Sequence, residues 1–259
     1  MPKCLVCFKW TLDEKDIKIK PEDLTLDVTR AKGKISDFDR NAIEAATQIV
    51  EQQGGEVHAL TYGTSAVKKS LKDVLSRGPQ RAYWIADDSA EKADAYVTAN
   101  VLAAAIRKLG PYDLILCGEG SSDSFNQQTA MRVAALLGLP CVSFVLKLSV
   151  EGGAVKATRG LGDTTEVATV KGPVVVSVLS QINHPRIPSL KQVLGASKKP
   201  KQEIKIADLG LAPDKLQPRA VHKFVRGFAT KRKHITFKKT NAAANVAKLV
   251  TSLTAEGLQ

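Results

Sequence analysis

The stretch Leu114–Thr129 concentrates residue types that could bind a ligand. An apolar strand pattern ends in a Gly-x-Gly turn with two serines, and an apolar helix pattern follows from about residue 126. Backbone N–H groups and hydroxyls therefore gather where a strand gives way to a helix, which favours a phosphate or nucleotide site. The alternative is a tight turn in which Asp123 or Ser124 caps the helix. The candidate ligand-binding residues here are Gly118, Gly120, Ser121 and Ser122.

Three further loops follow or border predicted strands and carry polar residues. Lys9 and Asp13 come after the first strand, residues 36–39 precede the first helix, and residues 62–64 end the second strand. The carboxyl ends of parallel strands share one edge of a sheet, so these loops are expected to converge on one ligand. We find no Ser/His/Asp or Cys/His set and no suitably placed carboxylate pair, so the sequence predicts a binding site without catalytic residues and argues against hydrolase chemistry.

The elements that must position these loops follow an alternating pattern. Strands are predicted at 4–10, 57–62, 82–86 and 114–117, and helices at about 37–54, 67–78, 94–109 and 127–137. Asp37 or Asp39 is expected to cap the first of these helices. Strands are then expected at 142–150, 154–159, 166–170 and 174–179, with a Gly-Gly hairpin turn at 152–153. We therefore predict an α/β fold with a doubly wound, mainly parallel, Rossmann-like sheet and added antiparallel strands. Residues 17–28 are expected to hold short edge strands.

Two stretches follow the sheet. The loop 183–190 carries two prolines and is expected to be exposed and stiff, with Pro188 in the first turn of a helix to about Ala196. We assign residues 1–190 to the α/β domain. Residues 191–259 are expected to form an extended basic arm that ends in a helix, at about 241–253, and packs on a partner.

The net charge of +12 is concentrated in this arm. Lys191–Thr240 contains 14 Lys and Arg against 3 Asp and Glu, and few aromatic residues lie among them. A solvated tail or a docking surface for an acidic protein is therefore favoured over a nucleic-acid surface.

Cysteines and histidines indicate no metal site. The four cysteines lie in apolar runs and are expected in the core, and a strand would direct Cys4 and Cys7 to opposite faces rather than into a redox or metal pair. The histidines show no metal-binding spacing. No apolar run approaches the ~18 residues of a membrane helix and the N-terminus lacks a signal-peptide pattern, so we expect a cytoplasmic protein without membrane insertion.

The chain resembles the β subunit of the electron-transfer flavoproteins over nearly its whole length. Four segments carry the likeness: the first strand leading to Lys9, the loop Ser36-Asp37-Phe38-Asp39, the loop from Gly118 to Asp123 with Gln128-Thr129, and Asn183-His-Pro185-Arg186-Ile-Pro-Ser-Leu190 before a lysine-rich stretch. The family usually has Asn-Pro at 36–37 and Gly at position 130, where this chain has Ser-Asp and Ala.

The resemblance implies a heterodimer in which the α subunit holds the redox FAD, while the β subunit binds AMP or a second FAD. Such a pair carries electrons from flavin dehydrogenases, typically of the acyl-CoA type, to a quinone oxidoreductase. The residues that it implies around the adenylate are Cys7, Lys9, Ser36, Asp37, Phe38, Asp39, Tyr62, Gly118, Gly120, Ser121, Ser122, Asp123, Gln127, Gln128 and Thr129. Those that it implies for dehydrogenase docking are Asn183, Pro185, Arg186 and Leu190.

Two alternatives stay open. The Gly-x-Gly-Ser-Ser-Asp form is closest to branches that serve specialised dehydrogenases or are linked to nitrogen fixation, which leaves AMP and FAD both possible in the β-subunit site. A stand-alone adenine-nucleotide-binding stress or signalling protein of the same fold is the second functional hypothesis.

Overall fold

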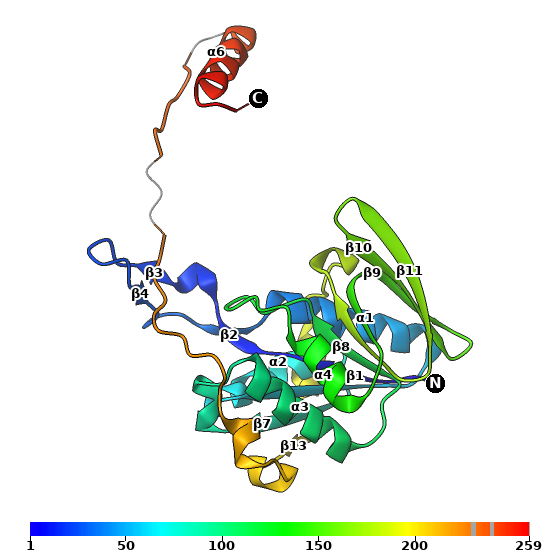
Figure 1. The fold of residues 1–259 in the computed structure, drawn as a ribbon. Coiled ribbons are helices and arrows are strands. Elements are labelled where there is room, and N and C mark those ends of the chain that lie inside the picture. Colours follow the sequence, from blue (N-terminus) through cyan, green and yellow to red (C-terminus); the bar gives the residue numbers. More distant parts are fainter. Residues whose placement is uncertain (229–231, 239–240, 259) are drawn as a thin grey trace.

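A nine-stranded sheet forms the centre of the part of the chain that the computed structural model describes, residues 1–228, 232–238 and 241–258. The strand order is β11-β10-β9-β12-β8-β1-β6-β7-β13 (Figure 1). Neighbours from β9 to β13 pair in parallel, whereas β10 pairs antiparallel with β9 and β11. The strands are β1 Lys3–Cys7, β6 Glu56–Gly63, β7 Arg81–Ala86, β8 Leu114–Gly118, β9 Cys141–Glu151, β10 Ala154–Leu161, β11 Thr164–Lys171, β12 Val174–Val178 and β13 Lys201–Glu203. The predicted doubly wound, mainly parallel α/β sheet is confirmed.

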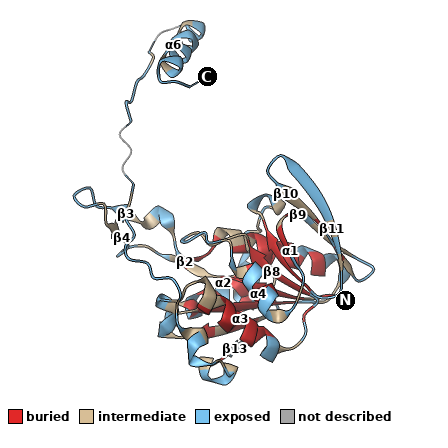
Figure 2. Ribbon diagram, in the orientation of Figure 1, coloured by how far each residue is buried: buried red, intermediate tan, exposed pale blue. Residues whose placement is uncertain are grey.

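Helices cover both faces of this sheet. They are α1 Asp37–Gln53, α2 Leu71–Ser76, α3 Ala95–Leu109, α4 Thr129–Leu137 and α5 Leu190–Ala196. Apolar residues of α1, α2 and α5 pack with Cys4 and Val6, while α3 and α4 pack with Leu5 and Cys7 on the opposite face. Figure 2 shows the buried strands and inner helix faces between these layers. The prediction that Cys4 and Cys7 point to opposite faces is confirmed, because side chains alternate along a strand.

The N-terminal excursion differs from the prediction. The first strand ends at Cys7 instead of continuing to residue 10, and Trp10–Leu12 (β2) pairs separately with Gly33–Ile35 (β5). Lys18–Ile19 (β3) and Leu26–Asp27 (β4) form their own small ladder rather than an edge of the main sheet. Alternating apolar residues predict a strand but not the partner with which it pairs.

Three expectations about helix N-termini were wrong: the cap of α1, the start of α4 and the first turn of α5. Ser36, not Asp37 or Asp39, occupies the N-cap position of α1. Helix α4 starts at residue 129 instead of about 126, since Phe125 and Gln127 have left-handed φ angles of 43° and 54°. In α5 the cap is Ser189, which forms a capping box with Gln192, so the preceding proline lies outside the helix.

Cys141 departs from the expected core placement, because it is exposed at the start of β9. The other three cysteines are buried, as predicted. Short 3₁₀ turns complete the body: η1 Glu14–Asp16, η2 Ser65–Ser70, η3 Asp88–Glu91, η4 Ser180–Ile182, η5 Ile206–Leu209 and η6 Pro213–Leu216.

The C-terminal region first returns to the sheet and then leaves it. Strand β13 pairs with β7 at the sheet edge, and the chain then runs out to helix α6 (Ala242–Ala255), which stands apart from the α/β body in Figure 1. Most of this helix is exposed (Figure 2), including its apolar side chains Val246, Leu249, Val250 and Leu253. Residues 229–231 and 239–240 of the predicted basic stretch lie outside the described residues. Within the part that the structure describes, no helix is long and apolar enough to cross a membrane.

Candidate functional site

The candidate ligand loops meet where the winding of the sheet reverses. Strands β1 and β8 are neighbours, and their helices leave to opposite faces, α1 from β1 and α4 from β8. Such a switch point is the usual ligand crevice of an open α/β sheet.

A buried carboxylate joins the ends of these two strands. Asp39 in α1 accepts the backbone N–H of Lys9 at 2.8 Å and that of Gly118 at 3.1 Å. Burial raises the pKa of Asp39 to about 7, although both N–H groups favour its ionised form. Asp39 therefore holds the β1 and β8 ends in register rather than capping its helix.

The loop after β8 is fastened to the start of α1 by paired hydroxyls. Ser122 N–H donates to Ser36 Oγ at 3.2 Å, and Asp37 N–H donates to Ser122 Oγ at 3.1 Å. The rings of Phe38 and Phe125 lie 5.1 Å apart between centroids. These contacts bring the sequence-predicted 36–39 and 118–125 segments together.

Both glycines of the Gly-x-Gly turn are required by packing within the chain. A Cβ on Gly118 would lie 2.6 Å from the backbone carbon of Phe38, and one on Gly120 would lie 2.7 Å from the ring of Phe125. The Gly-x-Gly pattern suggested that a ligand approaches the backbone closely at these two glycines. In the structure, α1 lies against Gly118 and the loop's own Phe125 lies against Gly120.

An ion pair spans the mouth of the crevice. Lys9 Nζ donates to Asp123 Oδ2 at 2.6 Å, and Asp123 Oδ1 accepts from Ser121 Oγ at 2.6 Å. Burial opposes ionisation of Asp123, but the Lys9 ammonium and the hydrogen bond from Ser121 together outweigh it and lower the pKa of that carboxyl. The carboxylate is therefore neutralised locally, which reduces its repulsion of a phosphate.

The start of α4 keeps its backbone donors free of a side-chain cap. Gln128 occupies the N-cap position without a capping hydrogen bond, and its Oε1 accepts from Arg132 Nε at 2.9 Å instead. Gln127 Nε2 donates to Glu119 Oε2 at 3.3 Å, and Thr129 is the first helical residue. An uncapped helix N-terminus is a donor set that suits a phosphate.

Other predicted residues lie at this edge with different partners. Cys7 is buried within β1, and the Tyr62 hydroxyl lies 3.1 Å from Ser89 Oγ. The carboxylate of Asp37 accepts from Lys34 Nζ at 2.8 Å, so only its backbone faces the loop. The structure thus brings together Lys9, residues 36–39 and residues 118–129, but not the Tyr62 hydroxyl. No group of metal-binding side chains occurs among the described residues.

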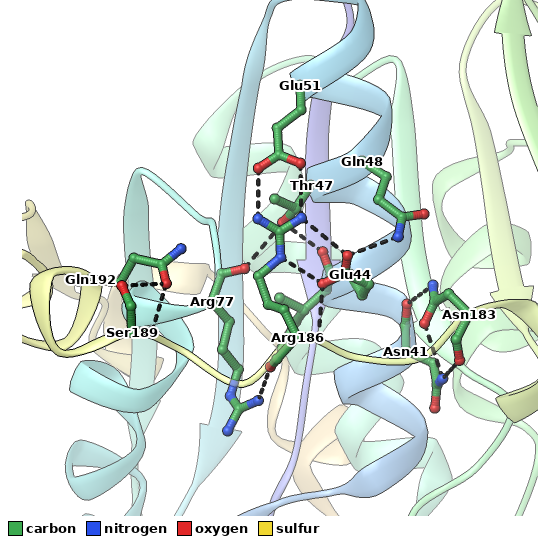
Figure 3. Close-up of polar contacts among 11 residues, drawn as sticks. Asn41, Glu44, Thr47, Gln48, Glu51, Arg77, Asn183, Arg186, Ser189 and Gln192 are labelled. Atoms are coloured by element: carbon green, nitrogen blue, oxygen red, sulfur yellow. Dashed lines mark hydrogen bonds and ion pairs between the residues drawn. The ribbon is translucent and has the colours of Figure 1, made fainter.

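The predicted docking loop is anchored on α1 by two asparagines, Asn41 and Asn183 (Figure 3). Asn41 Nδ2 donates to the backbone oxygens of Ser180 and Asn183, at 3.0 and 2.9 Å. Asn183 Nδ2 donates back to the Asn41 carbonyl at 3.0 Å. This reciprocal pair fixes the point where the loop leaves the sheet.

Arg186 points inward from the loop onto α1 (Figure 3). Its guanidinium contacts Glu44, which is buried, and Glu51 through two hydrogen bonds each, at 2.6–3.0 Å. Arg77 Nη1 donates to the Arg186 carbonyl at 3.1 Å. Hydrogen bonds to Glu51 first, and then to Glu44, raise the pKa of Arg186. The Arg186 guanidinium in turn lowers the pKa of both carboxyls. At Glu44 this lowering outweighs the opposite effect of burial.

Apolar side chains of the same loop point to solvent. Ile187 is 93% exposed, Leu190 75% and Leu194 61%. Pro185 is half-buried beside the Arg186 anchor. The loop therefore has a fixed polar base and an exposed apolar ridge, defined as Ile187, Leu190 and Leu194.

The partners of the docking loop were missed from the sequence. Asn41, Glu44 and Glu51 follow one another at helical spacing on one side of α1, and the first two are buried. Polar residues on a buried stripe of a helix require partners, so this spacing was the available signal. Their partners lie up to 142 residues away in sequence, which no local pattern reveals.

The sheet, its two helical layers and the crevice at the switch point define a Rossmann-like α/β protein. The model of the electron transfer flavoprotein domain matches residues 23–209. The chain belongs to this family, whose members take part in flavin-linked electron transfer and generally work with partner subunits and dehydrogenases.

Proposed function

We propose that the chain is the β subunit of an electron-transfer flavoprotein. In this role it binds an adenylate, pairs with an α subunit that holds the redox FAD, and docks the flavin dehydrogenase that supplies electrons. A quinone oxidoreductase then takes the electrons from the heterodimer. The observation that carries the proposal is the docking loop, in which the Arg186 anchor holds a 75% exposed Leu190 at the start of α5.

The anchor makes an exposed leucine effective as a docking residue. A loop that is already fixed by Asn183 and Arg186 loses little conformational entropy when it binds. Its apolar side chains gain the free energy of burial only when a partner covers them. Chemistry on this chain is not required, because the described site supplies backbone donors and hydroxyls rather than an acid–base pair.

The adenylate would lie at the switch point, against Lys9, the 36–39 turn and the start of α4. Its phosphate suits the uncapped α4 N-terminus. We leave AMP and the ADP part of a second FAD as the two candidates. In both cases the role of these residues is to bind and orient the nucleotide, and the flavin supplies the redox chemistry.

The C-terminal arm would complete the heterodimer. Helix α6 exposes an apolar face and the stretch 221–228 exposes Val221, Phe224, Val225 and Phe228. An isolated helix of this length is marginal in water without a surface to pack on. The α subunit is the proposed surface.

The test is co-expression of the chain with its cognate α subunit, followed by purification and spectroscopy. A complex with a flavin spectrum and donor-dependent flavin reduction supports the proposal, and Leu190→Ala is expected to slow that reduction at limiting donor. Leu161→Ala, at an exposed leucine that ends β10, is the matched control. Failure to form a flavin-containing complex, or unchanged reduction with Leu190→Ala, contradicts it.

The bound nucleotide is identified by mass spectrometry of the extracted complex. One flavin with AMP indicates a simple carrier, while two flavins without AMP indicate the bifurcating type. A stable monomer or homodimer that binds ATP without flavin would instead favour the stand-alone nucleotide-binding protein.

A further inference from the structure

A second cleft, of ≈ 730 Å³, opens beside the loop that precedes α4. Its walls are the first turns of α3 and α4 and the arm segment 215–222. Asn126 and Gln128 are among its lining residues, so the cleft adjoins the proposed nucleotide loop.

The arm segment is fixed across the cleft by one carboxylate. Asp94 Oδ1 accepts the N–H of Val97 and so caps α3, at 2.9 Å. Its Oδ2 accepts the N–H groups of Arg219 and Ala220, at 2.8 and 3.0 Å. Burial opposes ionisation of Asp94, but these N–H groups outweigh it and lower the pKa of the carboxyl.

An aromatic contact adds to this attachment. The guanidinium carbon of Arg219 lies 4.5 Å from the ring centroid of Tyr96, and its Nη2 lies 3.3 Å from the Tyr96 hydroxyl. The hydrogen bond from Arg219 lowers the pKa of Tyr96. These contacts therefore hold segment 215–222 in place as one wall of the cleft.

The cleft is cationic. Arg132, Lys215 and Arg219 line it, and the carboxylate among its lining residues, Asp94, has both oxygens occupied by N–H donors. Lys215 also pairs with Asp214 at 3.4 Å, an exposed pair that holds the lysine only weakly. The two guanidinium groups carry planar donor pairs that match phosphate oxygens.

We propose that this cleft binds a diphosphate group, with Arg132 and Arg219 as its principal ligands. Its volume lies in the range of ligand pockets and exceeds the needs of a single phosphate. Because Gln128 belongs both to the proposed nucleotide loop and to the cleft, a nucleotide bound there extends its phosphate chain toward the two arginines. This extension rests on the proposed function, whereas binding of inorganic pyrophosphate needs only the cleft.

The experiment is calorimetric titration of the full-length chain, co-purified with its α subunit, with inorganic pyrophosphate. Wild type is expected to bind at one saturable site, and Arg132→Gln to weaken binding roughly tenfold through loss of a charge-assisted hydrogen bond. Arg219→Gln gives the same loss but also loosens the arm, so Arg132→Gln is the decisive variant. Lys156→Gln, which removes an exposed positive charge on β10, is the control and leaves binding unchanged.

A second arm compares nucleotides. ADP is expected to bind more tightly than AMP to wild type, and the two are expected to bind alike in the Arg132→Gln, Arg219→Gln double variant. Absence of saturable pyrophosphate binding, an equal loss with Lys156→Gln, or occlusion of the cleft by the α subunit overturns the inference. A complex that retains its flavin spectrum and donor reduction but fails these titrations overturns this inference alone and leaves the proposed function standing.

Discussion

The guanidinium of Arg186 meets the carboxylate of Glu44 edge to edge, with Nε–Oε2 at 2.7 Å and Nη2–Oε1 at 3.0 Å. Glu44 is buried in α1, whose first turn also carries the Ser36–Asp39 segment of the crevice. One helix therefore supports both the proposed nucleotide site at its N-terminus and the docking loop two turns further along. This arrangement leads us to treat Arg186 as a positioning residue rather than a contact with the dehydrogenase.

Arg186→Lys is expected to lower the free energy of unfolding by about 1–3 kcal/mol, since an ammonium cannot reproduce the planar two-point contact and leaves Glu44 poorly paired. The proposed dehydrogenase is expected to show a higher KM with little change in flavin content. Urea unfolding and donor titration measure the two effects. Arg30→Lys, at an exposed arginine, is the control, and a variant that matches it in both measurements would contradict the positioning role.

The fold could be predicted from the sequence because buried parallel strands read as continuous apolar runs. Val174–Val178 and Leu114–Gly118 are buried at every position, and helices of matching length separate most such strands. Each local signal agrees with the sheet that results. The ends of elements were less predictable, since the left-handed Phe125 and Gln127 delay α4 against its apolar pattern.

The candidate site was predictable only in part. Loops at the carboxyl ends of the strands do meet, as parallel topology requires. The carboxylates that organise them could not be assigned, because Asp39 bonds to Gly118 across 79 residues and Glu44 to Arg186 across 142. The sequence shows that Asp39 lies near a helix start, where an aspartate commonly caps the helix. In the fold the side chain is buried, and it accepts the N–H groups of Lys9 and Gly118 instead.

Gly118→Ala is expected to destabilise the chain by about 1–3 kcal/mol, because the new Cβ would lie 2.6 Å from the backbone of Phe38. Gly195→Ala, in α5, is the matched control, since its Cβ meets nothing within 4 Å and alanine favours a helix. Thermal or urea unfolding compares the two variants. Equal stability of the two would show that α1 moves aside at no cost.

The buried carboxyl of Asp39 predicts a pH dependence of stability. Burial raises its pKa from the ordinary 3.8 to about 7 in the fold, so between these pH values the folded chain keeps a proton that the unfolded chain releases. The contribution of this carboxyl to the free energy of unfolding is fully present below about pH 4. It is lost as the pH rises to 7, by up to about 1.4 kcal/mol for each pH unit. Asp39→Asn removes this slope, although it also weakens one of the two N–H contacts. Urea unfolding at pH 5, 6, 7 and 8 measures it, and parallel curves for wild type and variant would contradict the prediction.

Asp123 offers a test of the proposed phosphate site through electrostatics alone. Its carboxylate holds Lys9 Nζ at 2.6 Å across the crevice mouth, so Asp123→Asn frees the ammonium for a ligand and removes a negative charge. AMP is expected to bind about two- to fivefold more tightly to this variant, the scale of an exposed charge contact. The gain is expected to shrink at high salt, because exposed charges are screened.

Asp163→Asn removes the same charge in the exposed β10–β11 turn and is expected to leave affinity unchanged. Calorimetric titration with AMP at two salt concentrations measures the change in affinity. Weaker binding by Asp123→Asn would contradict the prediction. It would mean that the hydrogen bonds of Asp123 with Ser121 and Ser124 order the loop, and that this ordering outweighs the repulsion between the carboxylate and the phosphate.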